Sequence, residues 1–204
     1  MVVPTGILFL ASVSPCLDIT QEIKIDHDNV RDLFSRFKQS TDAKDETLIA
    51  NTLIREMSVH GNAGEVSVYN DYSPLGLDDA VKHNKGEHAT VKKLVRKAEH
   101  APASMKNYDV ILAEAAEAFL QHASEGEAEQ FPKLLEKSLV PAQEIARAFI
   151  RARGSVPTRP HPLSPQTGGL FQKAMGMHGR AQDKVVESLR GRGYVGLGFK
   201  HPEV

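Results

Sequence analysis

Four of the nine histidines in this 204-residue chain occur in two matched pairs, and their neighbours repeat with them. Residues 26–33 read DHDNVRDL and residues 87–94 read EHATVKKL, so acid, histidine, valine, base and leucine recur in the same order. Residues 60–65 read HGNAGE and residues 122–127 read HASEGE, in which histidine, glycine and glutamate coincide. Such internal similarity predicts two copies of one structural unit.

The chemistry that these residue types support is metal binding. Neutral imidazole together with carboxylate is a ligand set for iron, zinc or manganese, and two carboxylates can bridge a pair of ions. A single histidine on a helix is more often a hydrogen-bonded or partly exposed residue. Its recurrence in both halves favours a shared site. Five histidines lack the paired context and are interpreted as ordinary residues: His83, His100, His161, His178 and His201.

The elements that position these histidines are predicted to be helices, because the apolar residues recur at steps of three, four and seven. The pattern predicts helices over residues 20–39, 45–70, 78–100, 105–136 and 141–153. Pro132 marks an end or a kink within the fourth. The connections are short and no strand pattern competes, so we expect an all-α, up-down-up-down four-helix bundle. In such a bundle, side chains partway along each helix meet at one level of the core.

The C-terminal third differs in composition. Residues 154–169 read GSVPTRPHPLSPQTGG, which predicts a Pro-rich extended strap across the surface. We expect an extra amphipathic helix over residues 170–190, followed by a mobile glycine-rich end. The predicted organisation is therefore a bundle domain over residues 20–138 and a C-terminal region of helix, strap and tail helix over residues 139–204.

Charge and cysteine usage limit the partners and the compartment. The net charge is −1, from 25 basic and 26 acidic residues, so no global field recruits nucleic acid or an anionic membrane. The apolar run near the N-terminus is too short to span a bilayer and has no preceding Lys or Arg, which disfavours a signal peptide. The single cysteine, Cys16, excludes an internal disulfide framework. We expect a cytoplasmic protein without nucleic-acid or membrane partners.

The combination of DHDNV, H-x4-E, GEH and H-x4-EAEQFP resembles the hemerythrin-like, HHE cation-binding family over about residues 22–135. The TRPHP stretch also resembles tails of fungal members. This resemblance implies a four-helix bundle with a non-heme di-iron centre that binds dioxygen or senses iron or oxygen. Carried over by position, it assigns these candidate metal ligands: His27, His60, Glu65, His88, His122 and Glu127.

Both glutamates depart from the family pattern. Many members carry the first glutamate four residues after the histidine, where this chain has Gly64 and Gly126. A residue five positions along a helix lies roughly 140° from the first, so Glu65 and Glu127 are aimed less directly at the histidine side. A π-bulge, which is common at functional sites, would help on either helix.

Further departures concern neighbouring positions. Glu125 and Glu129 share the face of His122 and are alternative carboxylate ligands. Asn84 occurs where oxygen-carrying hemerythrins have a histidine four residues before His88. Tyr69 and Tyr72 could lie near the site, although tyrosine at a helix end is more often a packing residue.

Three functions remain open from sequence. The first is a protein that binds a di-iron centre and dioxygen. The second is an oxidase or oxygenase, in which Gly64 and Gly126 widen the site for a small organic substrate. The third is a bundle that has lost its metal and serves as an interaction domain.

Overall fold

The fold is given by a computed structural model that describes residues 17–69, 78–137, 141–161 and 193–203, with isolated positions between 179 and 187. The N-terminal apolar run, Tyr72 and much of the predicted strap and tail helix lie outside these residues. The helical elements are α1 (Ile19–Gln39), α2 (Ala43–Val66), α4 (Asp78–His100), α5 (Tyr108–Glu125), the π-helical turn η2 (Gly126–Gln130), α6 (Phe131–Lys137) and α7 (Ala142–Ser155).

The first two helices begin at aspartate caps. Asp18 accepts a hydrogen bond of 2.8 Å from the backbone N–H of Thr20, at the start of α1. Asp42 accepts bonds of 2.9 Å from the N–H groups of Lys44 and Asp45, at the start of α2. These side chains satisfy N–H groups that have no partner within the helix, and so mark where α1 and α2 begin.

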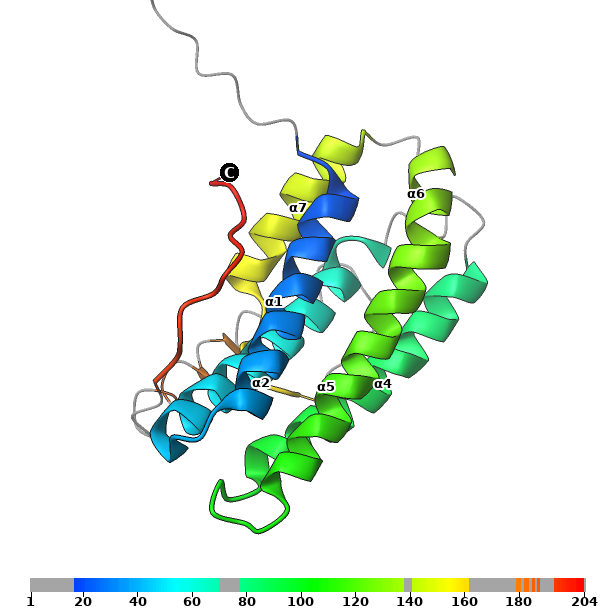
Figure 1. Ribbon diagram of the computed structural model, residues 1–204. Helices are drawn as coiled ribbons and strands as arrows, with labels where there is room; N and C mark the ends of the chain where they lie inside the picture. The colour runs from blue at the N-terminus through cyan, green and yellow to red at the C-terminus, as the bar shows by residue number, and fades with distance from the viewer. Residues whose placement is uncertain are drawn as a thin grey trace, which may run out of the picture.

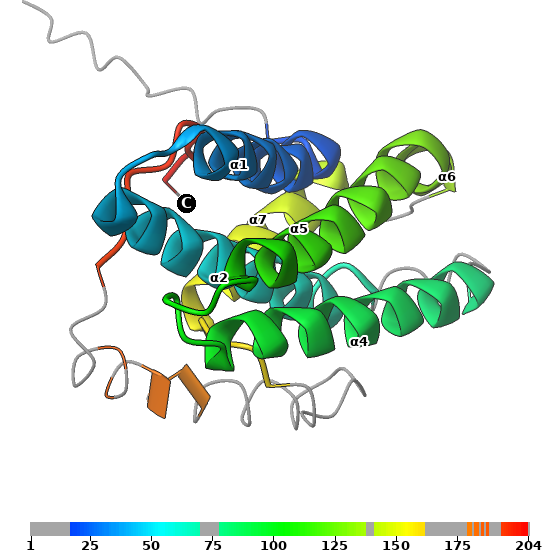
Figure 2. The same ribbon diagram turned by 60° about the horizontal axis from the view of Figure 1, so that its bottom comes forward.

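Helices α1, α2, α4 and α5 form an up-down bundle, and α7 packs against α1 and α2 (Figures 1 and 2). The predicted all-α class is confirmed, and the described residues contain no strand. Because α7 shares the apolar core with α1 and α2, the helix after residue 139 is part of the same packed body. The division into domains at residue 138 stays a prediction.

The fourth predicted helix, over residues 105–136, is built in three pieces. It begins at Tyr108, runs as α5 to Glu125, widens into η2 and continues as α6. Pro132 is the second residue of α6, so the helical segment continues past it. A π-bulge, which would help on either helix, is therefore present on this one, whereas α2 stays α-helical through Glu65.

The apolar core consists of two clusters with the four paired histidines between them. One cluster joins α1, α2, α4 and α5 and includes Leu53, Leu112 and Phe119. The other joins the N-terminal part of α1 to α2 and α7 and includes Ile19 and Phe149. The polar layer therefore lies at the depth where apolar packing is interrupted, as the repeat predicted.

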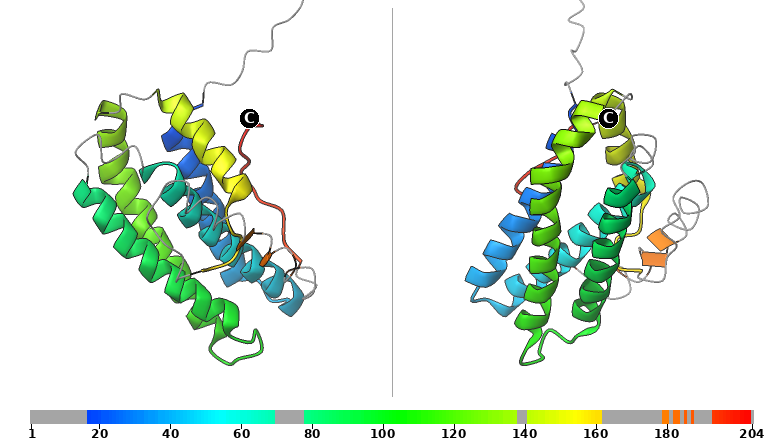
Figure 3. Two further views of the ribbon diagram at one scale, coloured as in Figure 1. Left: turned by 180° about the vertical axis from the view of Figure 1, so that it is seen from behind. Right: turned by 90° about the vertical axis from the view of Figure 1, so that its right-hand side faces the viewer.

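The glycine-rich end, which we expected to be mobile, packs against the bundle over residues 193–203 (Figure 3). The buried amide of Asn29 on α1 donates to the carbonyl of Phe199 and accepts from its N–H, both at 3.0 Å. Thr52 on α2 accepts from the N–H of Val195 at 3.0 Å. Composition missed this contact because the polar groups that hold the tail belong to helices far away in sequence.

Candidate metal centre

Four histidines converge at one level, one from each helix of the bundle. His60, His88 and His122 on α2, α4 and α5 have donor atoms within 4.8 Å of one another. The Nε2 atoms of His88 and His122 face each other at 2.9 Å. The ring of His27 on α1 lies beside that of His60, with 4.8 Å between centroids. All four side chains are buried.

Each of these imidazoles has a carboxylate against its Nδ1 atom. The four Nδ1–oxygen pairs are His27–Glu127 at 2.7 Å, His60–Asp26 at 3.1 Å, His88–Glu65 at 3.3 Å and His122–Glu87 at 2.7 Å. An ionised carboxylate only accepts hydrogen bonds, so each Nδ1 carries the hydrogen. The Nε2 atom of a neutral ring is then the one with a free lone pair.

Burial favours the neutral form of three of these rings, those of His27, His88 and His122. Desolvation lowers the pKa of His27 to about 4 and that of His88 to about 3, against the opposing effect of their carboxylate partners. Burial lowers the pKa of His122 as well, although its bond to Glu87 acts in the opposite direction. At neutral pH these three rings therefore have the protonation state that metal binding requires.

Glu65, a predicted metal ligand, lies on the Nδ1 side of His88 and is fully buried. Lys92 donates to both of its oxygens, at 2.7 and 2.8 Å. Burial alone would raise the pKa of Glu65, but the bond from His88 and the charge of Lys92 lower it. Glu65 is thus an anion held between an ammonium group and an imidazole.

Glu127, the second predicted carboxylate ligand, lies on the Nδ1 side of His27. It accepts bonds from His27 and from Arg31 at 2.7 and 2.8 Å. The bond from His27 lowers the pKa of Glu127 to about 2, with Arg31 acting in the same direction and burial opposing both. Glu127 belongs to η2, so the π-helical turn directs it toward α1.

Two further carboxylates of the centre, Asp26 and Glu87, were not among the predicted site residues. Each directly precedes a paired histidine in sequence, yet each contacts the histidine on the next helix of its own hairpin. The recurrence of an acid directly before a histidine in both halves of the repeat was the sequence signal that could have identified them. Of the alternative carboxylates, Glu125 pairs with the exposed His83 at 3.4 Å, and Glu129 is exposed.

The four histidines line a cavity of about 30 Å³, which is more than the ~10–15 Å³ that one water needs. Gly64 and Gly126 both line it. A Cβ atom at Gly64 would lie 3.8 Å from the ring of His88, and one at Gly126 would meet nothing within 4 Å. The glycines therefore leave space beside the histidines, as expected, but the space is small.

Three neighbours on the cavity wall are polar: Tyr69, Asn84 and Gln130. The hydroxyl of Tyr69 lies 3.1 Å from Nε2 of His88. Asn84 and Gln130 exchange two amide hydrogen bonds of 2.6 and 2.7 Å across the wall. The amide of Asn84 is therefore paired with a residue of η2. No imidazole is present at this position of the site.

The donor set fits a metal ion. Nε2 of His27 is buried without a hydrogen-bond partner. Buried polar atoms without partners are rare in proteins and cost about 1 to 3 kcal/mol. An unpartnered lone pair beside three clustered imidazoles is the arrangement that a cation would satisfy.

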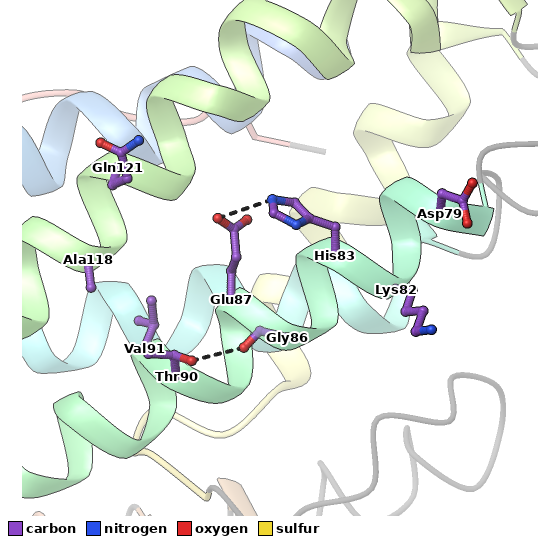
Figure 4. Close-up of a pocket in the computed structure, with 9 residues that line it drawn as sticks. All are labelled: Asp79, Lys82, His83, Gly86, Glu87, Thr90, Val91, Ala118 and Gln121. Carbon is purple, nitrogen blue, oxygen red and sulfur yellow. Dashed lines mark hydrogen bonds and ion pairs between the residues drawn. The ribbon is translucent and has the colours of Figure 1, made fainter.

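A second group of possible ligands lies at the surface. His83, Glu87 and Glu125 have donor atoms within 4.8 Å of one another. His83 and Glu87 line a hollow of about 610 Å³ between α4 and α5 (Figure 4). His83 is exposed, and its contacts with the two carboxylates are long ion pairs of 3.4 Å. Exposed groups of this kind commonly pair without an ion, so the buried histidines form the stronger site.

The sequence profile described as the hemerythrin HHE cation-binding domain matches residues 18–134, more than half of the chain. The chain belongs to this family. Within the hemerythrin HHE match lie all four histidines and their carboxylates. An uncharacterized hemerythrin-like protein of Schizosaccharomyces pombe is 27% identical over 176 residues, which cover 84% of this chain and 86% of that protein. No solved structure matches.

The hemerythrin HHE match ends at residue 134, but contacts to the centre continue beyond it. Arg153 of α7 and His201 of the tail both contact Asp26. His201, interpreted from sequence as an ordinary histidine, is therefore next to the site. No described helix has the length and apolar character needed to cross a bilayer.

Lowering the pH should destabilise the metal-free protein between about pH 6.5 and 4. In this window the unfolded chain protonates His27 and His88 while the folded protein does not, because their folded pKa values are about 4 and 3. The unfolded state then binds more protons. The free energy of unfolding therefore decreases as the pH is lowered, by at most about 1.4 kcal/mol per pH unit and group. Urea titrations with a chelator present should show a shallower dependence for His88→Gln. The exposed His100→Gln variant is the control, and equal slopes in both variants would contradict this account.

Lys92→Met should destabilise the protein by about 3 kcal/mol, because it removes the ammonium partner of a buried carboxylate. Lys93→Met, the adjacent exposed position on α4, should change stability by less than about 0.5 kcal/mol. Urea denaturation of the two variants at pH 7 measures the difference. A similar small effect at both positions would show that Glu65 does not depend on Lys92.

Proposed function

We propose that this protein is a non-heme iron protein that binds a di-iron or other metal centre, and dioxygen, within its helical bundle. The observation that supports it is the pairing of every core imidazole with a carboxylate at Nδ1. Histidines that bind metals characteristically donate their other ring N–H in this way, which fixes the tautomer and raises ligand basicity. Four such pairs around one cavity are difficult to explain by packing alone.

The proposal divides the six predicted ligands into two roles. The four imidazoles bind through Nε2, whereas Glu65 and Glu127 orient His88 and His27 from behind. Glu65 in particular has both oxygens bound to Lys92, so it would have to break an ion pair to bind a metal. Imidazole nitrogen suits iron, and also zinc, copper and nickel.

The small cavity favours a diatomic ligand over an organic substrate. Iron, when bound, would supply the open coordination position for dioxygen. A pocket for a drug-sized organic molecule has about 300 Å³ or more, roughly ten times the space beside these histidines. Phe119, Phe131 and Phe149 surround the rings of His27 and His60 and keep bulk water away from that half of the site. The oxygen-binding function is therefore preferred to the oxidase alternative.

The sequence-based assignment to the cytoplasm is part of this proposal. A single cysteine suits a reducing compartment, and reduced iron is the form that binds dioxygen reversibly. No nucleic-acid or membrane partner is proposed.

His60→Ala and His122→Ala should each lower the iron content of protein purified from iron-supplemented cells. Partners behind a metal ligand alone contribute about 10 to 100-fold in affinity, so loss of a ligand should weaken binding by ~10-fold or more. His161→Ala is the control, since His161 pairs with Asp183 outside the bundle core. Elemental analysis measures all three variants. The same iron content in all of them, or no iron in the wild type after anaerobic loading, would refute the proposal.

Exposure of the iron-loaded, reduced protein to air should change its absorption spectrum reversibly. Cycles of oxygen and argon should restore both states. The reason is that the cavity has room for dioxygen but not for a larger organic reductant that would consume it. Irreversible oxygen consumption that requires an added organic compound would instead identify an oxidase. Absence of any spectral change with oxygen would remove the dioxygen part of the proposal.

A further inference from the structure

Asp26 is contacted by side chains from three different elements of the chain. It is fully buried, with one oxygen against Nδ1 of His60 at 3.1 Å. Arg153 donates to that same oxygen, and His201 contacts the other at 2.8 Å. Three donors from three different elements therefore determine which way this carboxylate faces.

Two of those donors come from outside the family match. Arg153 belongs to α7 and also binds Glu56 at 2.9 Å. His201 belongs to the tail and places its second nitrogen 2.8 Å from Glu22. The tail is tied to α1 and α2 by backbone hydrogen bonds at Phe199 and Val195, which bring His201 to this position. Figure 3 shows the tail and α7 on the same side of the molecule as α1.

The other hairpin provides an internal comparison. Glu87 occupies the repeat position that corresponds to Asp26 and contacts Nδ1 of His122. Its side chain is 22% exposed, and its further ion-pair partner is the exposed His83 at 3.4 Å. The side chain of Asp26 is not exposed, and it has two short contacts, from Arg153 and His201, with the segment beyond residue 134. The two halves of the repeat thus differ in how their carboxylates are held.

We propose that Arg153 and His201 are positioning residues for the metal centre, and that the segment beyond residue 134 sets the tautomer and orientation of His60 by holding Asp26. The part of this statement that concerns metal affinity rests on the proposed function. The part that concerns His60 itself does not. Neither residue contacts the cavity, so they act on the site through Asp26.

The physical reason is geometric. A buried aspartate with a single hydrogen-bond partner can adopt rotamers in which its carboxylate no longer contacts that partner. Contacts to both oxygens remove this freedom, and a ligand ring that is already oriented loses less entropy when an ion binds. Removing His201 frees the oxygen that faces away from His60 and lets the carboxylate turn.

The test compares His201→Ala, His201→Gln and the control His83→Ala, which removes the corresponding neighbour of Glu87. In metal-free protein, ¹⁵N NMR of the imidazoles should show His60 with its hydrogen on Nδ1 in the wild type and in His83→Ala. In His201→Ala that tautomer should lose population, and His122 should be unchanged. Glutamine can donate one bond to Asp26 and should restore the wild-type signal in part. An unchanged His60 spectrum in His201→Ala would overturn the proposal.

Metal affinity provides the second measurement, with Fe²⁺ and Co²⁺ titrated against a chelator. His201→Ala should bind about 10-fold more weakly than the wild type, with His201→Gln between them and His83→Ala equal to the wild type. Arg153→Lys, which keeps a cation beside Asp26 and Glu56, should also weaken binding if it still folds by circular dichroism. Equal affinity of His201→Ala and the wild type would refute the positioning role. Absence of binding in the wild type would instead refute the proposed function, and the NMR result would then decide the inference by itself.

Discussion

The hydrogen bond from each imidazole Nδ1 to a carboxylate is the interaction on which the centre depends. Without it, a buried histidine could expose either nitrogen to the cavity, and a protonated nitrogen binds no metal. With it, all four rings have their free lone pair on Nε2. Three of these carboxylates also have a cationic partner that compensates their charge: Arg31 for Glu127, Lys92 for Glu65 and Arg153 for Asp26. Glu87 is partly exposed to solvent instead.

The pairing also joins the two halves of the repeat. Within each hairpin, the acid on the first helix holds the histidine on the second, as Asp26 holds His60. Between hairpins, the glutamate on the second helix holds the histidine on the first helix of the other half, as Glu65 holds His88. Each hairpin thus completes the other, and neither has an oriented set of imidazoles by itself. This reciprocal arrangement explains why histidine and acid recur together in both halves.

Sequence reasoning found the helices and the four histidines because both depend on local spacing and on the repeat. It noted, from the angle between positions five apart, that a π-bulge on either helix would help the glutamates face the site, and the structure has one at Glu127 only. It did not identify Asp26 and Glu87 as partners, since residues adjacent in sequence point to different neighbours on a helix. The contact of His201 with Asp26 could not be predicted from the sequence for another reason. It is 175 residues from Asp26, and no periodic pattern reports a contact between a coil and a distant helix.

The two halves of the centre differ in electrostatic environment although their sequences correspond. Asp26 is buried beside Arg153 and His201, whose charge and hydrogen bonds, with those of His60, outweigh the effect of burial and lower its pKa. Glu87 reaches solvent, where water screens its interaction with His122. His60 and His122 therefore have Nδ1 partners in unlike surroundings, one buried beside an arginine and one open to solvent. Two imidazoles that correspond in the repeat thus become unequal through segments that the repeat does not contain.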